Sequence, residues 1–269
     1  MRVIFSNILA IYRRELQSYF ASPLAYTLAG IFWLLAGFFF VAILLGQGGL
    51  IDQTTAADSQ AQQGVRVAPI DVPYTFLQFF LSVLSNLVLF VLPILSMGLY
   101  AEERKRGTLE LLATSPITNW AVAVGKLLAV VTVFGSMVLP LLVYESMVLS
   151  ATNPPFNPAI AITGHVGLML LAAAILSLGM FISSLTDSTI LAAIFTFALV
   201  LLLYVVDLLT RTIGGPFGAA LGHLSLLKHF TNLSQGILDT SSLVLFASYI
   251  FLGIFLTAQS INAFRFQRS

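Results

Sequence analysis

Six long apolar stretches constrain the fold of this chain more than any other feature of its sequence. The stretches cover residues 24–46, 75–99, 120–149, 160–183, 189–209 and 243–262. Each reaches the length of about 20 residues that an α-helix needs to cross the hydrocarbon core of a bilayer. Only 9% of the 269 residues are charged, whereas a soluble domain carries about 25%. The sequence therefore predicts an all-α, polytopic membrane protein with six transmembrane helices in one domain, residues 1–269.

The third apolar stretch is longer than a simple span and contains Pro140. This length and this proline together predict a kink or a tilt of the helix. The alternative is that the stretch forms two short helices, one on each side of the proline.

Basic residues are distributed unequally between the two sides of the predicted membrane domain. Six spans place both termini and the 100–119 and 184–188 loops on one side. Nine basic residues lie on that side: Arg2, Arg13, Arg14, Arg104, Lys105, Arg106, Lys126, Arg265 and Arg268. Three lie on the other side, at Arg66, Arg211 and Lys228. Because cytoplasmic loops carry the excess of Lys and Arg, both termini are predicted to be cytoplasmic.

Residues 1–22 are predicted to form an amphipathic interface helix on the inner membrane surface. Apolar or aromatic side chains recur at helical spacing at Ile4, Ile8, Tyr12, Leu16 and Tyr19. Polar side chains gather on the other faces at Asn7, Arg13, Arg14, Gln17 and Ser18. The alternative is that this segment is only a positively charged flank of the first span.

Two sizeable segments are predicted on the outer side. Residues 47–73 are rich in Gln, Ala, Gly and Asp without apolar periodicity, so we expect a polar, partly mobile loop. Residues 210–242 carry spaced leucines and a phenylalanine among polar residues. That pattern predicts a re-entrant outer segment before the last helix, with a short helix that dips into or lies on the outer leaflet.

The loop after the second span concentrates five consecutive charges, residues 102–106, in a chain that otherwise avoids them. Gly107 is expected to end the second helix, and Thr108 can cap a new short helix whose early Glu110 suits the positive end of the helix dipole. Ser115-Pro116 would end this helix. Its leucines, at 109, 111 and 112, provide apolar surface that lipid does not need, so a soluble partner is expected to bind it.

This run, Glu102-Glu103-Arg104 followed by Gly107-Thr108-Leu109-Glu110-Leu111-Leu112 and then Ser115-Pro116, resembles the coupling-helix signature of ABC-2-type transporter permeases. Tyr12-Arg13-Arg14-Glu15-Leu16, followed by Ser22-Pro23, resembles the opening of the same family. Within the family, the chain is most similar to the gliding-motility-associated and NosY-like branch. The resemblance extends over essentially the whole chain.

The resemblance implies a permease of the bacterial plasma (inner) membrane, in which two permease subunits pair as a homo- or heterodimer. Each would dock a separate ABC ATPase subunit that binds ATP and Mg²⁺, so this chain would hold no cofactor. The ATPase-contacting residues would be Glu102, Glu103, Arg104, Arg106, Gly107, Thr108, Leu109, Glu110 and Leu111. Arg13, Arg14 and Glu15 would belong to the interface helix. ATPase movement would reach the second and fifth spans.

An exporter is the function that this resemblance implies, with the lipid bilayer and an accessory envelope protein as further partners and no role for nucleic acid. In a second interpretation, the same assembly works mechanically to move or regulate an envelope partner. The structural alternative for the motif is that its charges only mark a solvated loop on the positive side of the membrane. That alternative explains the basic residues but not the Gly-Thr-Leu-Glu-Leu-Leu segment.

Enzymatic functions find little support in the sequence. The chain lacks a Gly-x-x-x-x-Gly-Lys-Ser/Thr phosphate loop, so nucleotide chemistry is expected in another chain. Glu102-Glu103 near Arg106 suggests an intramembrane protease as a third interpretation. The histidines do not fit, because Ala161 and Ala219 precede His165 and His223 where that pattern needs Phe. No metal site is predicted, since the chain has no cysteine and the spacing of His223, His229 and Asp239 is not diagnostic.

Polar residues inside the spans are candidates for a translocation path. Gln78, Ser82, Ser85 and Asn86 lie mostly on one face of the second span, and such a stripe must face protein or water. Hydrogen bonding between helices explains it equally well. Thr196 on the fifth span raises the same question, whereas Asp207 and Arg211 are expected to pair with each other. Glu145, near the outer end of the third span, needs a neighbour from another helix. Tyr26, Tyr100 and Trp120 are expected in the inner aromatic belt.

Overall fold

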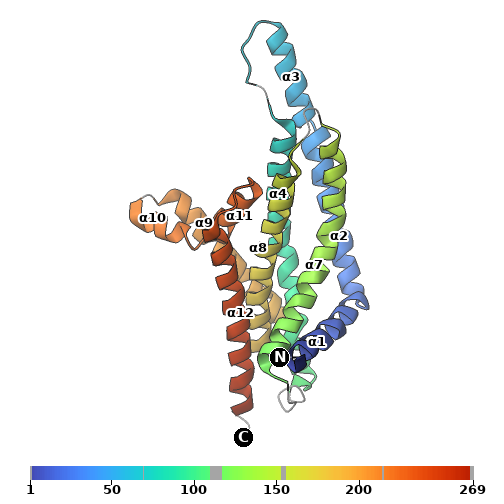
Figure 1. Ribbon diagram of the computed structural model, residues 1–269, viewed down its shortest axis with the longest axis vertical. Coiled ribbons are helices and arrows are strands. Elements are labelled where there is room, and N and C mark those ends of the chain that lie inside the picture. Colours follow the sequence, from blue (N-terminus) through green and yellow to red (C-terminus); the bar gives the residue numbers. More distant parts are fainter. Residues whose placement is uncertain (1, 69, 110–116, 153–155, 214, 267–269) are drawn as a thin grey trace.

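The structure is a computed structural model that describes residues 2–68, 70–109, 117–152, 156–213 and 215–266, and all regular structure in these ranges is helical (Figure 1). Six of the described helices are long and apolar enough to cross a membrane. The spanning segments are α2 (Pro23–Leu45), α4 (Val72–Ser96) continued by α5 (Gly98–Lys105), α7 (Asn119–Ser150), α8 (Pro158–Leu185), α9 (Thr189–Thr212) and α12 (Thr240–Phe266). The predicted all-α fold with six spans is confirmed.

The third span is one continuous helix of 32 residues that passes through Pro140. The alternative of two short helices is therefore wrong. Thr118 begins the helix by accepting a hydrogen bond from the backbone N–H of Ala121, as is typical of an N-terminal cap.

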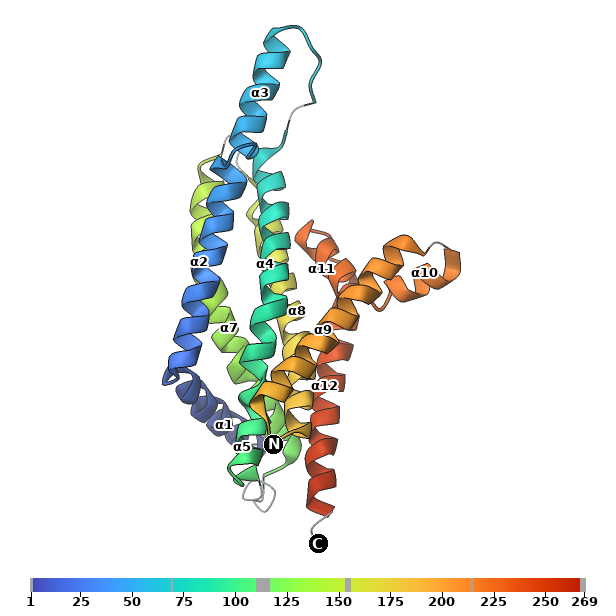
Figure 2. The same ribbon diagram turned by 180° about the vertical axis from the view of Figure 1, so that it is seen from behind.

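Helix α8 lies at the centre of the bundle, with α4, α7, α9, α12 and the short helix α11 (Leu226–Ser234) packed around it. Its buried face includes small residues such as Gly164, Gly167 and Gly179, which allow close approach of the neighbouring helices. Both chain ends lie at one end of the molecule with α1 (Arg2–Phe20) and α5, and α3 (Leu50–Gln62) lies at the opposite end (Figure 1 and Figure 2). We call these the terminal end and the distal end.

The N-terminal helix α1 (Arg2–Phe20) forms as predicted and packs obliquely across α7 (Figure 1). Ile11, Leu16 and Tyr19 contact the core, whereas Ile4 is 50% exposed. Gly125 of α7 makes this contact close, because a Cβ atom added there would lie 2.9 Å from Ile11 Cγ2. The face of α1 that would bind lipid at a free membrane surface is thus partly occupied by protein.

The distal segments contain more helix than predicted. The 47–73 segment, predicted as a polar, partly mobile loop, includes the helix α3 (Leu50–Gln62), in which only Leu50 is buried. Alanine and glutamine are good helix formers without any apolar face, and Asp52 lies in the favourable first turn. Apolar periodicity could not reveal such a helix, because the helix has no face to bury.

The 210–242 segment forms two short helices, α10 (Gly215–Gly222) and α11 (Leu226–Ser234). Leu226, Phe230 and Leu233 of α11 are buried against α8 and α12, which fits the predicted short helix before the last span. Helices α9 and α10 project sideways from the bundle (Figure 2).

The second span is interrupted where α4 passes into α5. Pro93 lies in the last turn of α4, and Met97 separates the two helices. Ser183 of α8 stabilises the interruption, because its hydroxyl accepts hydrogen bonds from the backbone N–H groups of Tyr100 and Ala101 at 3.1 and 3.0 Å. The same hydroxyl donates to Met97 O at 2.7 Å. One α8 side chain thus binds three backbone groups around the interruption.

Helix packing around α8 leads to a first prediction. A Cβ atom on Gly253 of α12 would lie 2.5 Å from the backbone carbonyl carbon of Ser177, and backbone atoms cannot move aside as a flexible side chain does. Gly253→Ala should therefore lower the unfolding free energy by about 1–3 kcal/mol, measured by thermal unfolding in detergent. The matched control Gly30→Ala has no neighbour within 4 Å and should not be destabilised. Equal stability of the two variants would contradict the packing of α12 on α8.

Candidate functional site

The predicted coupling loop begins with an ordered helix end. Gly107 adopts φ +70°, a conformation that glycine adopts without strain. The Thr108 N–H donates to Glu103 O and the Gly107 N–H to Arg104 O, at 3.0 and 3.1 Å. This pair of bonds is a Schellman motif, so Gly107 ends the second helix as predicted. Residues 110–116, which carry most of the expected short helix with Glu110 and Leu111, lie outside the described residues.

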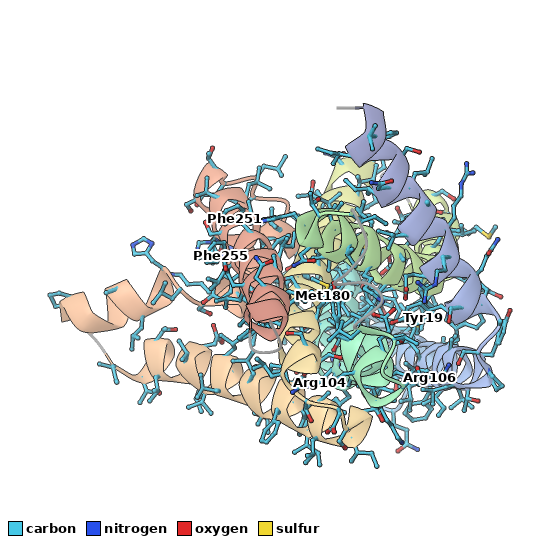
Figure 3. All side chains as sticks on the ribbon, turned by 90° about the horizontal axis from the view of Figure 1, so that it is seen from below. Tyr19, Arg104, Arg106, Met180, Phe251 and Phe255 are labelled. Atoms are coloured by element: carbon cyan, nitrogen blue, oxygen red, sulfur yellow. The ribbon has the colours of Figure 1, made fainter. Side chains whose placement is uncertain are left out.

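The charged residues of α5 divide into exposed and internal groups. Glu102 and Arg106 form an exposed ion pair of 2.5 Å, one helical turn apart, and Lys105 is also exposed. Arg104 donates to Ser184 O of α8 at 3.1 Å, and Glu103 is buried. In a view onto the terminal end, Arg104 lies towards α8 and Arg106 towards α1 (Figure 3).

Leu109 is also internal, with 7% of its surface exposed. The expectation that it offers apolar surface to a soluble partner therefore does not fit its position. It packs into the hydrophobic core of the chain, where it anchors the start of the loop.

Lys126 lies at the centre of an ionic cluster that joins three helices. Its Nζ atom is 2.9 Å from Glu15 Oε1 of α1 and 3.1 Å from Glu103 Oε1 of α5. Arg14 of α1 approaches the same Glu103 oxygen at 3.5 Å. Nζ also lies 5.0 Å from the ring centroid of Tyr100, within the range of a cation–π contact. We call Arg14, Glu15, Glu103 and Lys126 the Lys126 cluster.

The cluster is mostly withdrawn from water. Lys126 is 2% exposed, and the Glu15 and Glu103 side chains are 13% and 11% exposed. Only Arg14 reaches solvent, with its side chain 66% exposed. The four formal charges cancel, and both carboxylates depend on the same ammonium group. Each carboxylate would be costly to bury without that partner.

Tyr19 extends the contact between α1 and the second span. Its hydroxyl donates to Leu95 O of α4 at 2.6 Å. Burial, and then the charges of Glu15 and Glu102, raise the pKa of the Tyr19 phenol well above its ordinary value. The phenol therefore keeps the proton that this hydrogen bond needs.

The position of Lys126 in the sequence is a signal for this cluster. Lys126 stands seven residues inside the third span, where a charge must find a partner; we counted it only as a basic residue of the cytoplasmic side. Tyr100, expected in the aromatic belt, is fully buried beneath Lys126, so that expectation was wrong. Tyr26 and Trp120 are exposed, at 61% and 38%, as interfacial anchors are.

The residues proposed for a translocation path lie in three places. Gln78, Ser82, Ser85 and Asn86 line one cavity of about 400 Å³ between α4, α9 and α11, to which Tyr204, Asp207, Thr231 and Ser234 also contribute. Thr196 is fully buried and donates to Ala192 O of its own helix. Glu145 is buried beside His165 of α8. Thr196 and Glu145 therefore do not line this cavity.

Both explanations of the polar stripe on α4 hold in part. Gln78 donates to Ser234 O of α11 at 2.7 Å, which is hydrogen bonding between helices. Ser82 and Asn86 are exposed in the middle of a span, where polar side chains need protein or water as a neighbour. Asp207, expected to pair with Arg211, accepts a hydrogen bond from Ser225 of the segment before α11.

The described histidines do not support the protease interpretation. His165 contacts Glu145, and His229 lies 2.8 Å from Ser242 Oγ, whereas Glu103 binds Lys126 at the terminal end. Among the described residues, there is no group of three side chains that could hold a metal ion.

The structure defines a multi-pass helical membrane protein with six spans. Buried charges of the Lys126 cluster join its second and third spans to the N-terminal helix α1 at the terminal end. The amino-acid sequence matches the family described as ABC-2 family transporter protein over residues 9–266. The chain belongs to this family and is a membrane permease subunit of an ABC transporter. Comparison with curated proteins gives no match.

The Lys126 cluster predicts a strong effect of removing its single ammonium group. Lys126→Met should lower the unfolding free energy by about 3–5 kcal/mol, because Glu15 and Glu103 then share no buried cation. The loss is measured by thermal or denaturant unfolding of the purified protein. The triple variant with Glu15→Gln and Glu103→Gln should recover most of it. The control Lys105→Met, at an exposed position, should change stability by no more than about 0.5 kcal/mol. A Lys126→Met variant as stable as this control would contradict the cluster.

Proposed function

We propose that this protein is the membrane-spanning subunit of an ATP-driven exporter in a bacterial plasma membrane. It would work as a homo- or heterodimer with two ABC ATPase subunits, which bind ATP and Mg²⁺, on the cytoplasmic side. The terminal end would face the cytoplasm, since the basic residues are concentrated there. The observation that carries the proposal is that α5 has two different faces. One face exposes the charges of Glu102, Lys105 and Arg106. The other face contacts α1, α7 and α8 through ion pairs and a hydrogen bond.

This arrangement suggests a route for mechanical coupling. A load from a docked ATPase on the segment after α5 would reach α8 through Arg104 and Ser183. It would reach α1 and α7 through Glu103 and Lys126. These polar contacts favour the second, third and fourth spans as the first to respond, in place of the second and fifth spans expected from the family resemblance.

The exposed polar face of α4 supports a shared path between two permease subunits. Ser82 and Asn86 are exposed on a mostly apolar helix, and lipid offers no hydrogen bonds to them. A second subunit that covers this face would enclose the cavity beside α9 and α11 and give these side chains protein or water as neighbours. The cavity contains hydroxyl, amide and carboxyl groups, which suits a substrate with polar groups.

The mechanical alternative uses the same assembly to move or regulate an accessory envelope protein. Helix α3, exposed at the distal end, is the feature that favours it. Directional movement of a substrate into or out of sealed vesicles would distinguish the exporter from this alternative.

The coupling proposal predicts a specific effect of the exposed charges of α5. Glu102→Lys combined with Arg106→Glu reverses both charges and keeps an intrahelical pair, so unfolding stability should change by no more than about 1 kcal/mol. Stimulation of the partner ATPase by the reconstituted permease should fall at least about tenfold, because the docking pattern is reversed. The control variant Arg66→Glu reverses a charge on the distal side and should leave stimulation of the ATPase unchanged. Normal stimulation by the α5 variant would argue against docking at this face.

The absence of cysteine from the chain allows a direct test of the path. A single Ser82→Cys substitution should react with a water-soluble thiol reagent in membranes, because the cavity is expected to hold water. Ser177→Cys, fully buried between α8 and α12, should remain unlabelled under the same conditions. If Ser82→Cys reacts only with lipid-soluble reagents, this face of α4 contacts lipid and does not form a path.

A further inference from the structure

Glu145 and His165 form a buried pair in the distal half of the membrane domain. Glu145 lies five residues before the end of α7 and His165 seven residues after the start of α8, which places both roughly 8–10 Å below the distal helix ends. Glu145 Oε2 is 3.1 Å from His165 Nε2. The exposed fractions are 1% for Glu145 and 4% for His165. An ionisable pair so deep in a membrane domain suggests a function.

The contacts around the pair define which hydrogen-bonding groups are available. His165 Nδ1 lies 2.9 Å from Ala161 O. A carbonyl oxygen only accepts hydrogen bonds, so Nδ1 carries a proton. The contact of 3.1 Å between His165 Nε2 and Glu145 Oε2 does not have the alignment of a hydrogen bond donated by Nε2–H. Both Glu145 carboxyl oxygens are buried without another hydrogen-bond partner among the described residues. The contacts therefore do not match an imidazolium ring that donates to a carboxylate.

Other ionisable groups do not compensate a charge at this site. The described ionisable side chains on elements packed around the distal halves of α7 and α8 are Asp71, Tyr74, Tyr204, Asp207, Lys228, His229, Asp239 and Tyr249. Both Glu145 carboxyl oxygens and His165 Nε2 have no hydrogen-bond partner among the described residues, and His165 Nδ1 contacts Ala161 O. Tyr144, next to Glu145 on α7, is 66% exposed and points away from the bundle.

We propose that Glu145 and His165 form a proton-binding site inside the membrane domain, in which one proton, held on the Glu145 carboxyl group, keeps the distal halves of α7 and α8 together. With that proton, both side chains are neutral. Loss of the proton leaves a buried carboxylate without a cation, and gain of a second proton leaves a buried imidazolium without an anion. Either unpaired charge is costly to bury, so packing of α7 on α8 depends on a single bound proton.

This site differs in kind from the Lys126 cluster, in which Lys126 Nζ lies 2.9 and 3.1 Å from the oxygens of two glutamate side chains. The proton site responds to the proton concentration that reaches the distal side. The inference does not depend on which substrate the protein moves.

Paired glutamine substitutions test the proposal in the full-length protein in lipid nanodiscs. Thermal unfolding is measured across an acid-to-alkaline pH series for wild type, Glu145→Gln, His165→Gln and the double variant. The wild-type Tm should fall by about 6 °C or more at each extreme. The fall in Tm at alkaline pH should be absent from Glu145→Gln, and the fall at acid pH should be absent from His165→Gln. The double variant should show neither fall. His223→Gln, at an exposed histidine, should keep the wild-type profile.

Infrared spectroscopy gives a second, independent measurement that remains informative if a variant folds poorly. Wild-type protein at neutral pH should show a protonated carboxyl C=O band that shifts in D₂O, is absent from Glu145→Gln and disappears where the alkaline fall in Tm occurs. A Glu145 group that is ionised at neutral pH would overturn the proposal. So would an alkaline fall in Glu145→Gln equal to that of wild type.

Discussion

The buried ammonium group of Lys126 is the interaction on which the terminal end of this permease depends. An amino group in a membrane helix must recover in protein contacts what it loses in hydration. Lys126 does so with two carboxylates from different helices and the face of Tyr100. Helix α1 therefore cannot leave α7 without separating Glu15 from Lys126 and Arg14 from Glu103. This constraint makes α1, α5 and α7 a connected unit rather than three neighbouring helices.

Ser183 gives the same unit a connection to the centre of the bundle. The interruption between α4 and α5 frees backbone groups that would be expensive to leave unpaired away from water. Ser183 binds three of them, and Arg104 adds a contact to Ser184 one residue further along α8. The second span can therefore continue from α4 into α5 without losing its attachment to α8. A force on α5 would be shared by these contacts and the Lys126 cluster.

The sequence was sufficient for the parts of the fold that follow from local chemistry. Span positions follow from apolar length, and the end of α5 follows from the need for glycine at a positive φ in position 107. Helix α1 followed from the helical spacing of its apolar side chains. Helix α3 was missed because it buries only Leu50. The partners of Lys126 and Glu145 were not predictable in detail, because each pair joins segments far apart in the chain. The sequence indicates only that an intramembrane charge such as Glu145 or Lys126 needs a neighbour, and not which residue that neighbour is.

Helix α7 carries both of the buried ionic sites, and their separation bears on how the membrane domain can move. Lys126 and Glu145 are 19 residues apart on one continuous helix, which corresponds to about 28 Å along its axis. The terminal site joins α7 to α1 and α5, and the distal site joins α7 to α8. The terminal attachment consists of the ion pairs of Lys126 with two glutamate side chains. The distal attachment holds only while one proton is bound. A change in protonation would therefore release the distal end of α7 while the contacts of Lys126 stay in place, so α7 would pivot about Lys126.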